Sequence, residues 1–240
     1  MRLLHKHIAA DRNMASKSVD RNMLSKSVDR NMLSKSMILR LTAILIYIIY
    51  CGYYTHIQAA TPAQILQTCS QKLSSARSVR GEFTITMNGK RMSGQLLSKG
   101  NKFTIQLPGL ATWYDGASMW SYSSANKETT LWKPTKSELA EANPLLYLSQ
   151  ASDYTVTEGK AVSGDLKTLI LTPRKRNTGI KRVVVTISTS TLLPKSIKIE
   201  ANSTSTLVNI KSLRLNTTIP DTSFKYDKNK YKGVQVIDLR

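Results

Sequence analysis

Alternation of apolar and polar residues with a period of two runs through most of the chain from Arg80 onward, and it restricts the fold more than any other feature. In the segment GEFTITM, Phe83, Ile85 and Met87 point to one side of an extended strand, and the residues between them point to the other. Asn88-Gly89 follows, which is the strongest short sequence indication of a hairpin. Further strands separated by turn residues fill 90–134, so the sequence predicts an antiparallel meander of about six strands.

A broken helical segment interrupts the meander. Thr135 and Glu138 form a capping box before ELAEA, and Pro144 ends that helix, with Asn143 as a new cap before LLYLSQ. About five more strands follow, then a helical turn predicted over 220–224 and a short strand-like end. Eleven strands with one apolar face tend to curl toward a barrel, and a wide or unclosed barrel leaves a cavity.

A second helical segment precedes the first strand. Thr61, Pro62 and Gln64 match a capping box with proline at the first helical position. The apolar residues that follow recur at helical spacing and include Cys69, which is expected to be a small core residue. Only the two helical segments are available to cover the mouth of the predicted barrel.

The first 59 residues are expected to lie outside this fold. Residues 1–36 consist mainly of near-identical nine-residue repeats, too short and polar to build a layer, and are predicted to be disordered, with a start site set too early as an alternative. In 37–59, a basic residue, an apolar run of about 14 residues and a small residue at the end form the pattern of a cleaved signal peptide. An uncleaved anchor is the alternative. The domain is then 60–240, expected in the periplasm.

The residues that this domain lacks limit its chemistry. All three histidines lie in the first 59 residues, and Cys69 is the only cysteine after them. The sequence therefore predicts no disulfide, no zinc site of cysteine and histidine, no cysteine–histidine or serine–histidine relay and no cofactor. Because the spacing of the carboxylates suggests no catalytic pair either, the domain is expected not to be an enzyme.

The domain is strongly basic. Residues 60–240 contain 26 basic and 12 acidic residues, a net charge of +14. Such a charge can attract nucleic acid, anionic lipid or polyanionic sugars, whereas solubility alone is the simpler interpretation. Export from the cytoplasm argues against nucleic acid.

The segment ATWYDGASMWSY holds two of the three tryptophans. Alternation places Trp113 opposite Tyr114 and puts Trp120 with Tyr122 on one face. Core packing, a sugar platform, a base-stacking surface and the wall of an apolar ligand cavity are the alternatives, and the cavity is natural for a barrel of this strand number. Asp115 with Gly116 is interpreted as a type I′ hairpin turn, not as a catalytic group.

From Ser78 to Leu148, and again at LTPR (171–174), SFKYD (223–227) and VIDLR (236–240), the sequence resembles LolA-type outer-membrane lipoprotein carriers, in the form found in Bacteroides-like bacteria. The order and spacing of these motifs carry the resemblance, which covers residues 62–240. It implies a mostly β fold, an unclosed antiparallel barrel of about 11 strands with a lid of short helices over an apolar cavity.

The resemblance also implies a function. Such carriers bind the acyl chains of lipoproteins, accept them from an inner-membrane ABC release complex, deliver them to the outer membrane or an acceptor there, and are monomers. A related barrel that binds or senses another lipid or amphiphile is the alternative, and an adhesion protein with an unoccupied barrel is a third.

The candidate binding residues follow from the alternation and the resemblance, with plain core packing as the alternative for each. The residues expected to line the acyl cavity are Phe83, Ile85, Leu96, Phe103, Ile105, Trp120, Leu131, Leu169, Leu171, Ile197, Ile199 and Ile210. The residues expected to form the lid are Leu66, Leu73, Leu139, Leu145, Leu146 and Leu148. Better-known carriers have an arginine before the phenylalanine strand that holds the closed state, and here Lys99 is the candidate base in its place, without the rigid fork of arginine.

Overall fold

The computed structural model describes residues 37, 39–40, 42–46, 60–162, 164–175 and 179–240. The chain divides into two units, residues 1–59 and 60–240. In the first unit the described residues are helical. The predicted repeats and much of the predicted signal peptide lie outside the described residues. None of the described helices is both long enough and apolar enough to span a bilayer.

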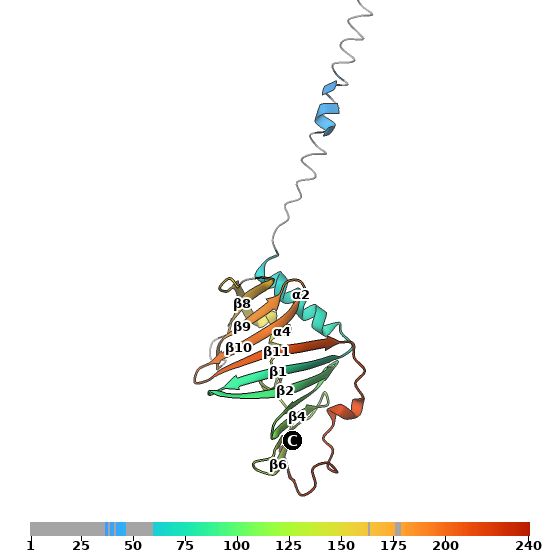
Figure 1. Ribbon diagram of the computed structural model, residues 1–240, viewed down its shortest axis with the longest axis vertical. Helices are drawn as coiled ribbons and strands as arrows, with labels where there is room; N and C mark the ends of the chain where they lie inside the picture. Colours follow the sequence, from blue (N-terminus) through green and yellow to red (C-terminus); the bar gives the residue numbers. More distant parts are fainter. Residues whose placement is uncertain (1–36, 38, 41, 47–59, 163, 176–178) are drawn as a thin grey trace, which may run out of the picture. The chain divides into compact units, whose positions relative to one another are not determined.

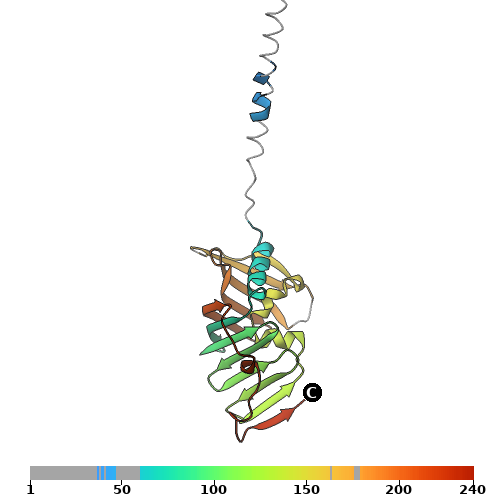
Figure 2. The same ribbon diagram turned by 90° about the vertical axis from the view of Figure 1, so that its right-hand side faces the viewer.

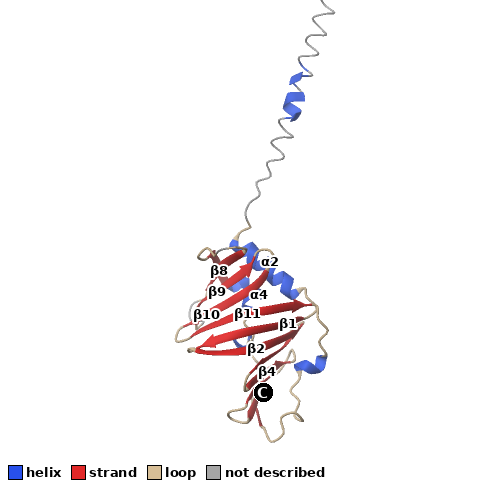
Figure 3. Cartoon of the chain, viewed as in Figure 1, coloured by secondary structure: helices blue, strands red, loops and turns tan. Residues whose placement is uncertain are grey.

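Twelve strands form one sheet in the second unit (Figures 1 and 3). They are β1 (Val79–Met87), β2 (Lys90–Lys99), β3 (Lys102–Leu107), β4 (Leu110–Tyr114), β5 (Met119–Ser123), β6 (Glu128–Trp132), β7 (Tyr154–Glu158), β8 (Leu166–Pro173), β9 (Ile180–Ser188), β10 (Leu193–Ala201), β11 (Ser205–Leu215) and β12 (Gln235–Asp238). The helical elements are α2 (Pro62–Ser74), α3 (Lys136–Ala142), α4 (Leu146–Ser149), η1 (Ala151–Asp153) and η2 (Asp221–Phe224). The predicted strands and helical segments are therefore present.

The sheet is open. Its strand order is β12-β6-β5-β4-β3-β2-β1-β11-β10-β9-β8-β7, so the two strand sets join through β1 and β11 at the centre. Neighbouring strands are antiparallel except for β12, which pairs parallel to β6. One end of the sheet is consequently formed by β6 and β12, and the other end is formed by β7. The segment that holds α3 and α4 is the covalent link between β6 and β7. This arrangement confirms an unclosed antiparallel barrel with short helices.

Local chemistry explains the main boundaries. Thr61 and Gln64 form the predicted capping box of α2, with N···O distances of 2.8 and 3.3 Å. Asn88 and Gly89 have φ angles of 51° and 75°, as a type I′ turn between β1 and β2 requires. Opposite Glu82 and Phe83, the register between β1 and β11 shifts by one residue, a bulge that adds bend to the sheet at its centre.

Two hydrophobic clusters fill the concave side. The first lies where α2 and α4 pack over β7 to β10, and its most buried members include Leu66, Cys69, Leu169 and Val185. The second lies over β1 to β5 and β11, and it centres on Phe83, Leu96, Phe103, Ile105, Met119 and Val208. Both clusters draw all their described members from residues 60–240, so this unit has a complete core of its own. Figure 2 shows α2 beside the ladder of strands.

The thiol of Cys69 illustrates the first cluster. The side chain is fully buried on α2, and burial raises its pKa to about 12, with a small opposing effect from Lys72. Because only the thiolate is nucleophilic, we expect native residues 60–240 to react with a disulfide reagent at pH 8 at least about a hundredfold more slowly than the unfolded protein. Stopped-flow or manual mixing with and without guanidinium measures this ratio. Fast stoichiometric labelling of the native protein would contradict the burial of Cys69.

Candidate functional site

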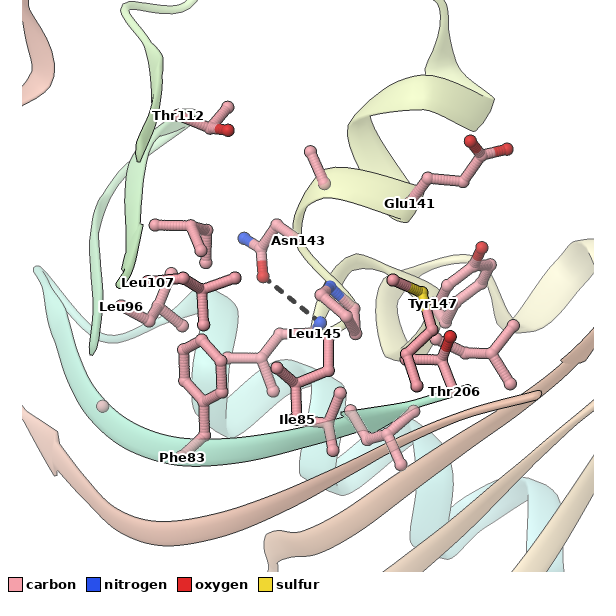
Figure 4. Close-up of a pocket in the computed structure, with 18 of the residues that line it drawn as sticks. Phe83, Ile85, Leu96, Leu107, Thr112, Glu141, Asn143, Leu145, Tyr147 and Thr206 are labelled. Carbon is pink, nitrogen blue, oxygen red and sulfur yellow. Dashed lines mark hydrogen bonds between the residues drawn. The ribbon is translucent and has the colours of Figure 1, made fainter. Parts of the chain in front are cut away.

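A cavity of about 530 Å³ opens between the two clusters, with the sheet on one side and the segment from α3 to α4 on the other. Its walls come from β1 to β5, from β9 to β11 and from residues 141–147. Figure 4 shows Leu145 reaching from the helical segment toward Ile85 and Phe83 of β1. Most of the sheet wall is aliphatic or aromatic, so the cavity suits an apolar ligand, and the polar residues of this wall are Glu82, Thr112, Ser121, Thr204 and Thr206.

The register of the strands arranges the sheet wall in rows. Directly paired residues point to the same face, so Ile197, Val208 and Ile85 form one row across β10, β11 and β1. Nearer the turn between β1 and β2, Ile199, Thr206 and Met87 form the next. Residues from strands far apart in sequence thus form one continuous apolar surface.

Gly94 of β2 makes room for the ring of Phe83. The two residues are paired across β1 and β2, and a Cβ atom on Gly94 would lie 2.6 Å from Phe83 Cζ, 2.6 Å from Leu107 Cδ2 and 2.8 Å from the carbonyl oxygen of Gln106. Only glycine leaves space for the ring here, since the carbonyl is part of the β3 backbone. The ring of Phe83 consequently lies over Gly94 in the wall of the cavity.

The opposite wall is short and internally fixed. Helix α3 begins at a capping box of Thr135 and Glu138 and ends at Asn143, whose buried side chain accepts a hydrogen bond from the amide of Leu145 at 3.2 Å (Figure 4). Asn143 thus fixes the turn between the two helices, whereas the N-cap of α4 is Leu145, without a side-chain capping bond, so the expectation that Asn143 caps the second helix is wrong. Pro144 separates the two helices. We call residues 136–149 the lid segment.

The lid segment contributes three polar side chains to the cavity, those of Glu141, Asn143 and Tyr147. The carboxylate of Glu141 is at the exposed end of α3, where it accepts a hydrogen bond from Ser137 at 3.3 Å. Tyr147 is buried, and burial, followed by Tyr154 and Glu141, raises the pKa of its hydroxyl well above the ordinary value. Tyr147 therefore stays neutral at physiological pH and can donate a hydrogen bond to a polar group of a ligand.

The structure places many of the candidate lining residues at the cavity. Those that line it are Phe83, Ile85, Leu96, Ile105, Ile197, Ile199 and Ile210. Three others share the concave face but lie where it is filled. Phe103 packs with Tyr114, at 5.4 Å between ring centroids, while Leu169 and Leu171 are fully covered in the first cluster beneath α2 and α4.

Trp120 and Leu131 lie on the opposite, outer face of the sheet, and the expectation that Trp120 faces the cavity is wrong. Trp120 is paired with Trp113 on one side and Leu131 on the other, so all three point the same way. Met119, one residue earlier, points inward and is buried in the second cluster. The sequence pattern places Trp120 and Tyr122 on one face of the strand correctly, but that face is the outer face and not the cavity face.

The tryptophan face is covered by the end of the chain. The rings of Tyr226 and Tyr231 lie 5.6 and 5.4 Å from Trp113, and Tyr231 also lies 4.5 Å from Tyr122. These four aromatic side chains form a small cluster on the outer face of β4 and β5. The tryptophan-rich segment is therefore part of a second packing layer.

Asp115 is a turn residue, as predicted, but the turn differs in type. Its carboxylate accepts hydrogen bonds from the amides of Ala117 and Ser118 at 2.9 and 2.8 Å. Gly116 has a φ of 102°, whereas Asp115 is not among the residues with positive φ. The loop therefore spans four residues, and the type I′ assignment is wrong.

The lid candidates divide between the two clusters. Leu145 lines the cavity, and Leu145 and Leu146 pack against both clusters. Leu139 packs against the second cluster, Leu148 and Leu66 are buried in the first, and Leu73 packs against it. The α2 residues thus form a fixed core, and the lid segment supplies the part that touches the cavity.

Lys99 does not face the cavity. It lies on the outer face, where its Nζ atom is 3.1 Å from Oδ1 of Asp221 in η2, and Lys102 lies 3.9 Å from the same oxygen. The hydrogen bond from Lys99 is the main cause that lowers the pKa of the Asp221 carboxyl. Because this ion pair attaches the C-terminal segment to the outer face, the geometry contradicts a gating contact between Lys99 and the lid segment.

Several cavity residues escaped the sequence reasoning. They include Gly81, Leu107, Leu110, Thr112, Asn143, Tyr147 and Val208. Val208 belongs to the same alternation as Ile210, so the sequence pattern contained it, whereas Gly81 and the lid residues depend on register and on the path of the chain. Within the described residues, no group of three or more histidine, cysteine, aspartate or glutamate side chains could hold a metal ion.

Comparisons with known proteins agree with this geometry. Residues 74–227 match the sequence profile of the family described as outer membrane lipoprotein carrier protein LolA. No curated protein sequence matches the chain significantly. Among solved structures, an uncharacterized conserved protein from Thermus thermophilus is similar with a TM-score of 0.51 at 10% identity, covering 73% of this chain and 98% of that one.

Two other solved structures are more distant. A LolA superfamily protein from Nitrosomonas europaea has a TM-score of 0.38 at 15% identity, covering 70% of this chain and 99% of that chain. MucB in the MucA/MucB complex of Pseudomonas aeruginosa has a TM-score of 0.36 at 12% identity, covering 69% and 61%. With a profile match over most of its length, the chain belongs to the family of outer membrane lipoprotein carrier proteins, LolA.

Proposed function

We propose that this protein is a periplasmic carrier that binds the acyl chains of lipoproteins in the cavity and moves them from the inner to the outer membrane. The observation that carries the proposal is the apolar cavity between the concave sheet and a short, proline-interrupted lid segment. A non-enzymatic role agrees with its walls, which offer apolar surface and few titratable groups.

The volume fits about one acyl chain. A methylene group occupies about as much space as a water molecule, roughly 30 Å³, so about 530 Å³ corresponds to roughly one long acyl chain. A lipoprotein with three chains needs more room. The lid segment is the part that can supply it, because Leu145 and Leu146 occupy the space between the two clusters.

Displacement of the lid segment also moderates the affinity. Each buried methylene contributes about 0.8 kcal/mol, so several acyl chains in a preformed pocket would be bound too tightly for release. Moving Leu145 and Leu146 out of their apolar contacts costs part of that gain. The break at Pro144 permits the two short helices to move separately, because proline donates no amide hydrogen bond.

The route of the cargo follows from the predicted signal peptide at 37–59. Export through this segment would place residues 60–240 in the periplasm, where the protein would accept cargo from an inner-membrane ABC release complex. Delivery would then be to the outer membrane, directly or through an acceptor.

The test is recovery of the natural ligand. We expect the protein purified from native periplasm to contain triacylated lipoprotein, detected by intact and peptide-level mass spectrometry. A variant with the lid substitution Leu145→Glu, purified in the same way, should have lost that cargo. Recovery of a small lipid from the wild-type protein in place of lipoprotein would contradict the proposal.

A second candidate, binding of a single-chain amphiphile, is favoured by one observation, the volume of the cavity in its present form. A ligand of that size would enter without displacement of the lid segment. Titration with a fatty acid and with a triacylated lipopeptide separates the two, since only the second requires the lid segment to move. Hydrogen exchange at residues 143–149 would increase with the lipopeptide and not with the fatty acid.

A further inference from the structure

Exposed apolar side chains are present at the mouth of the cavity. Five large hydrophobic side chains are exposed in the described part of 60–240, and two of them, Met87 at 40% and Leu110 at 44%, line the cavity. The two residues come from different hairpins, at the end of β1 and the beginning of β4. Exposed apolar surface gathered at one opening marks a place of contact with a partner or a membrane.

Next to Met87, the tip of the hairpin is basic. Lys90 is paired with Met87 across β1 and β2, so its side chain points to the concave face beside the methionine. Arg91 is paired with Thr86 and points to the outer face. Both side chains are exposed, and in the described part of the chain neither takes part in an ion pair.

The hairpin tip stands beyond the neighbouring strand. β3 pairs with β2 from Gln95 onward and ends at Leu107, beside Gly94, so residues 90–93 extend past the end of β3. At the Leu110 side of the mouth, the negative charge of Glu128 offsets the positive charge of the preceding Lys127. The net positive charge therefore lies at the tip of the hairpin between β1 and β2. Lys181, also exposed, follows the cavity residue Ile180 on the remaining side.

We propose that this mouth docks directly on an anionic phospholipid surface. Met87 and Leu110 enter the boundary between headgroups and acyl chains, while Lys90 and Arg91 contact the phosphates. An apolar contact and a basic contact together are the usual requirement for reversible membrane binding, since either alone is weak. Acyl chains would then pass between bilayer and cavity without crossing water. This surface does not depend on which acylated cargo the cavity carries.

The experiment measures co-sedimentation of residues 60–240 with vesicles of phosphatidylcholine alone and of an equal mixture with phosphatidylglycerol. We expect binding to the mixed vesicles that weakens with added salt. The variant Lys90→Glu/Arg91→Glu should bind them at least about twentyfold more weakly, since each basic residue near an anionic surface contributes roughly fivefold. At high salt, where the electrostatic contribution is screened, the variant Met87→Ser/Leu110→Ser should bind the mixed vesicles more weakly than the wild type does.

The matched control is Arg80→Glu/Arg214→Glu. Arg80 and Arg214 are exposed partners at the opposite end of β1 and β11, so the change in net charge is the same at a distance from the mouth. We expect this control to bind the mixed vesicles within about threefold of the wild type. Equal losses in the two variants would show that net charge alone attracts the protein and would overturn the proposal.

Two further outcomes would also overturn it. One is equal binding to both kinds of vesicle, and the other is no binding by the wild-type protein, in which case the exposed residues would belong to a protein interface. Binding of an acyl probe in the absence of vesicles is measured for the same variants. Lys90→Glu/Arg91→Glu should bind the probe as the wild type does, since neither residue lines the cavity, so failure of docking is distinguishable from failure of the carrier function.

Discussion

Replacing Leu145 by glutamate should weaken the binding of an acyl probe by about a hundredfold, while the fold stays intact. The substitution removes an apolar contact worth about 1.5–3 kcal/mol. It also places a carboxylate against the ligand, and this carboxylate must either lose its bound water, at a cost in free energy, or keep the acyl chain out of the cavity. Leu145 lies in the wall of the cavity and is half-buried, so the empty protein can turn the carboxylate toward solvent. A fluorescent fatty-acid or lipopeptide titration measures the loss.

Two controls bracket this result. Leu145→Met keeps the volume and polarity of the side chain and should bind the probe within about threefold of the wild type. Leu239→Glu introduces the same charge at a side chain that is 65% exposed and does not line the cavity, and it should have no effect. The double substitution Leu145→Glu/Leu146→Glu should bind still more weakly. Unchanged affinity in that variant would contradict the assignment of the lid segment.

Replacing Gly94 by valine should lower the free energy of unfolding by about 3 kcal/mol, and in a domain of this size the melting temperature should fall by about 6–12 °C. The first added carbon atom would already overlap Phe83, Leu107 and the carbonyl oxygen of Gln106. The two side chains can move at a cost, but the carbonyl cannot move without a change in β3. Denaturant titration followed by tryptophan fluorescence measures the loss.

A glycine in the same hairpin provides the comparison. Gly89 has open space around it but a φ of 75°, so Gly89→Ala should lose only about 1 kcal/mol, from backbone strain alone. The combination of Gly94→Val with Phe83→Ala should cost less than the sum of the two single changes, because the smaller side chain vacates part of the space. Full additivity would show that the ring of Phe83 does not lie over Gly94.

The strands and caps could be predicted from the sequence because their causes are local. Asn88-Gly89 fixes a turn by its own backbone preferences, and the capping boxes at Thr61 and Thr135 need only four consecutive residues each. What alternation could not give was the face of the sheet that Trp120 occupies. Alternation distinguishes inside from outside only where one face meets water, and on β4 and β5 both faces are covered.

The extent of the cavity was equally beyond the sequence. Leu169 and Ile199 look alike in their strands, yet Leu169 is completely covered and Ile199 stays half-buried at the cavity wall. The difference depends on where α2 and the lid segment lie on the sheet, which no local pattern specifies. Lys99 fails as a gating base for a similar reason, since its partner Asp221 is 122 residues away.

The open edge of the sheet has a mechanical consequence. A closed barrel can swell only by breaking hydrogen bonds between two of its strands, at about 1 kcal/mol for each. Here the sheet ends at β7 on one side and at β6 with β12 on the other, and the lid segment spans the interval between them. The sheet can therefore become flatter or more curved while all hydrogen bonds between its strands stay formed. The volume that the cavity can reach is then set by two properties, the stiffness of the sheet and the length of the one segment that connects its two ends.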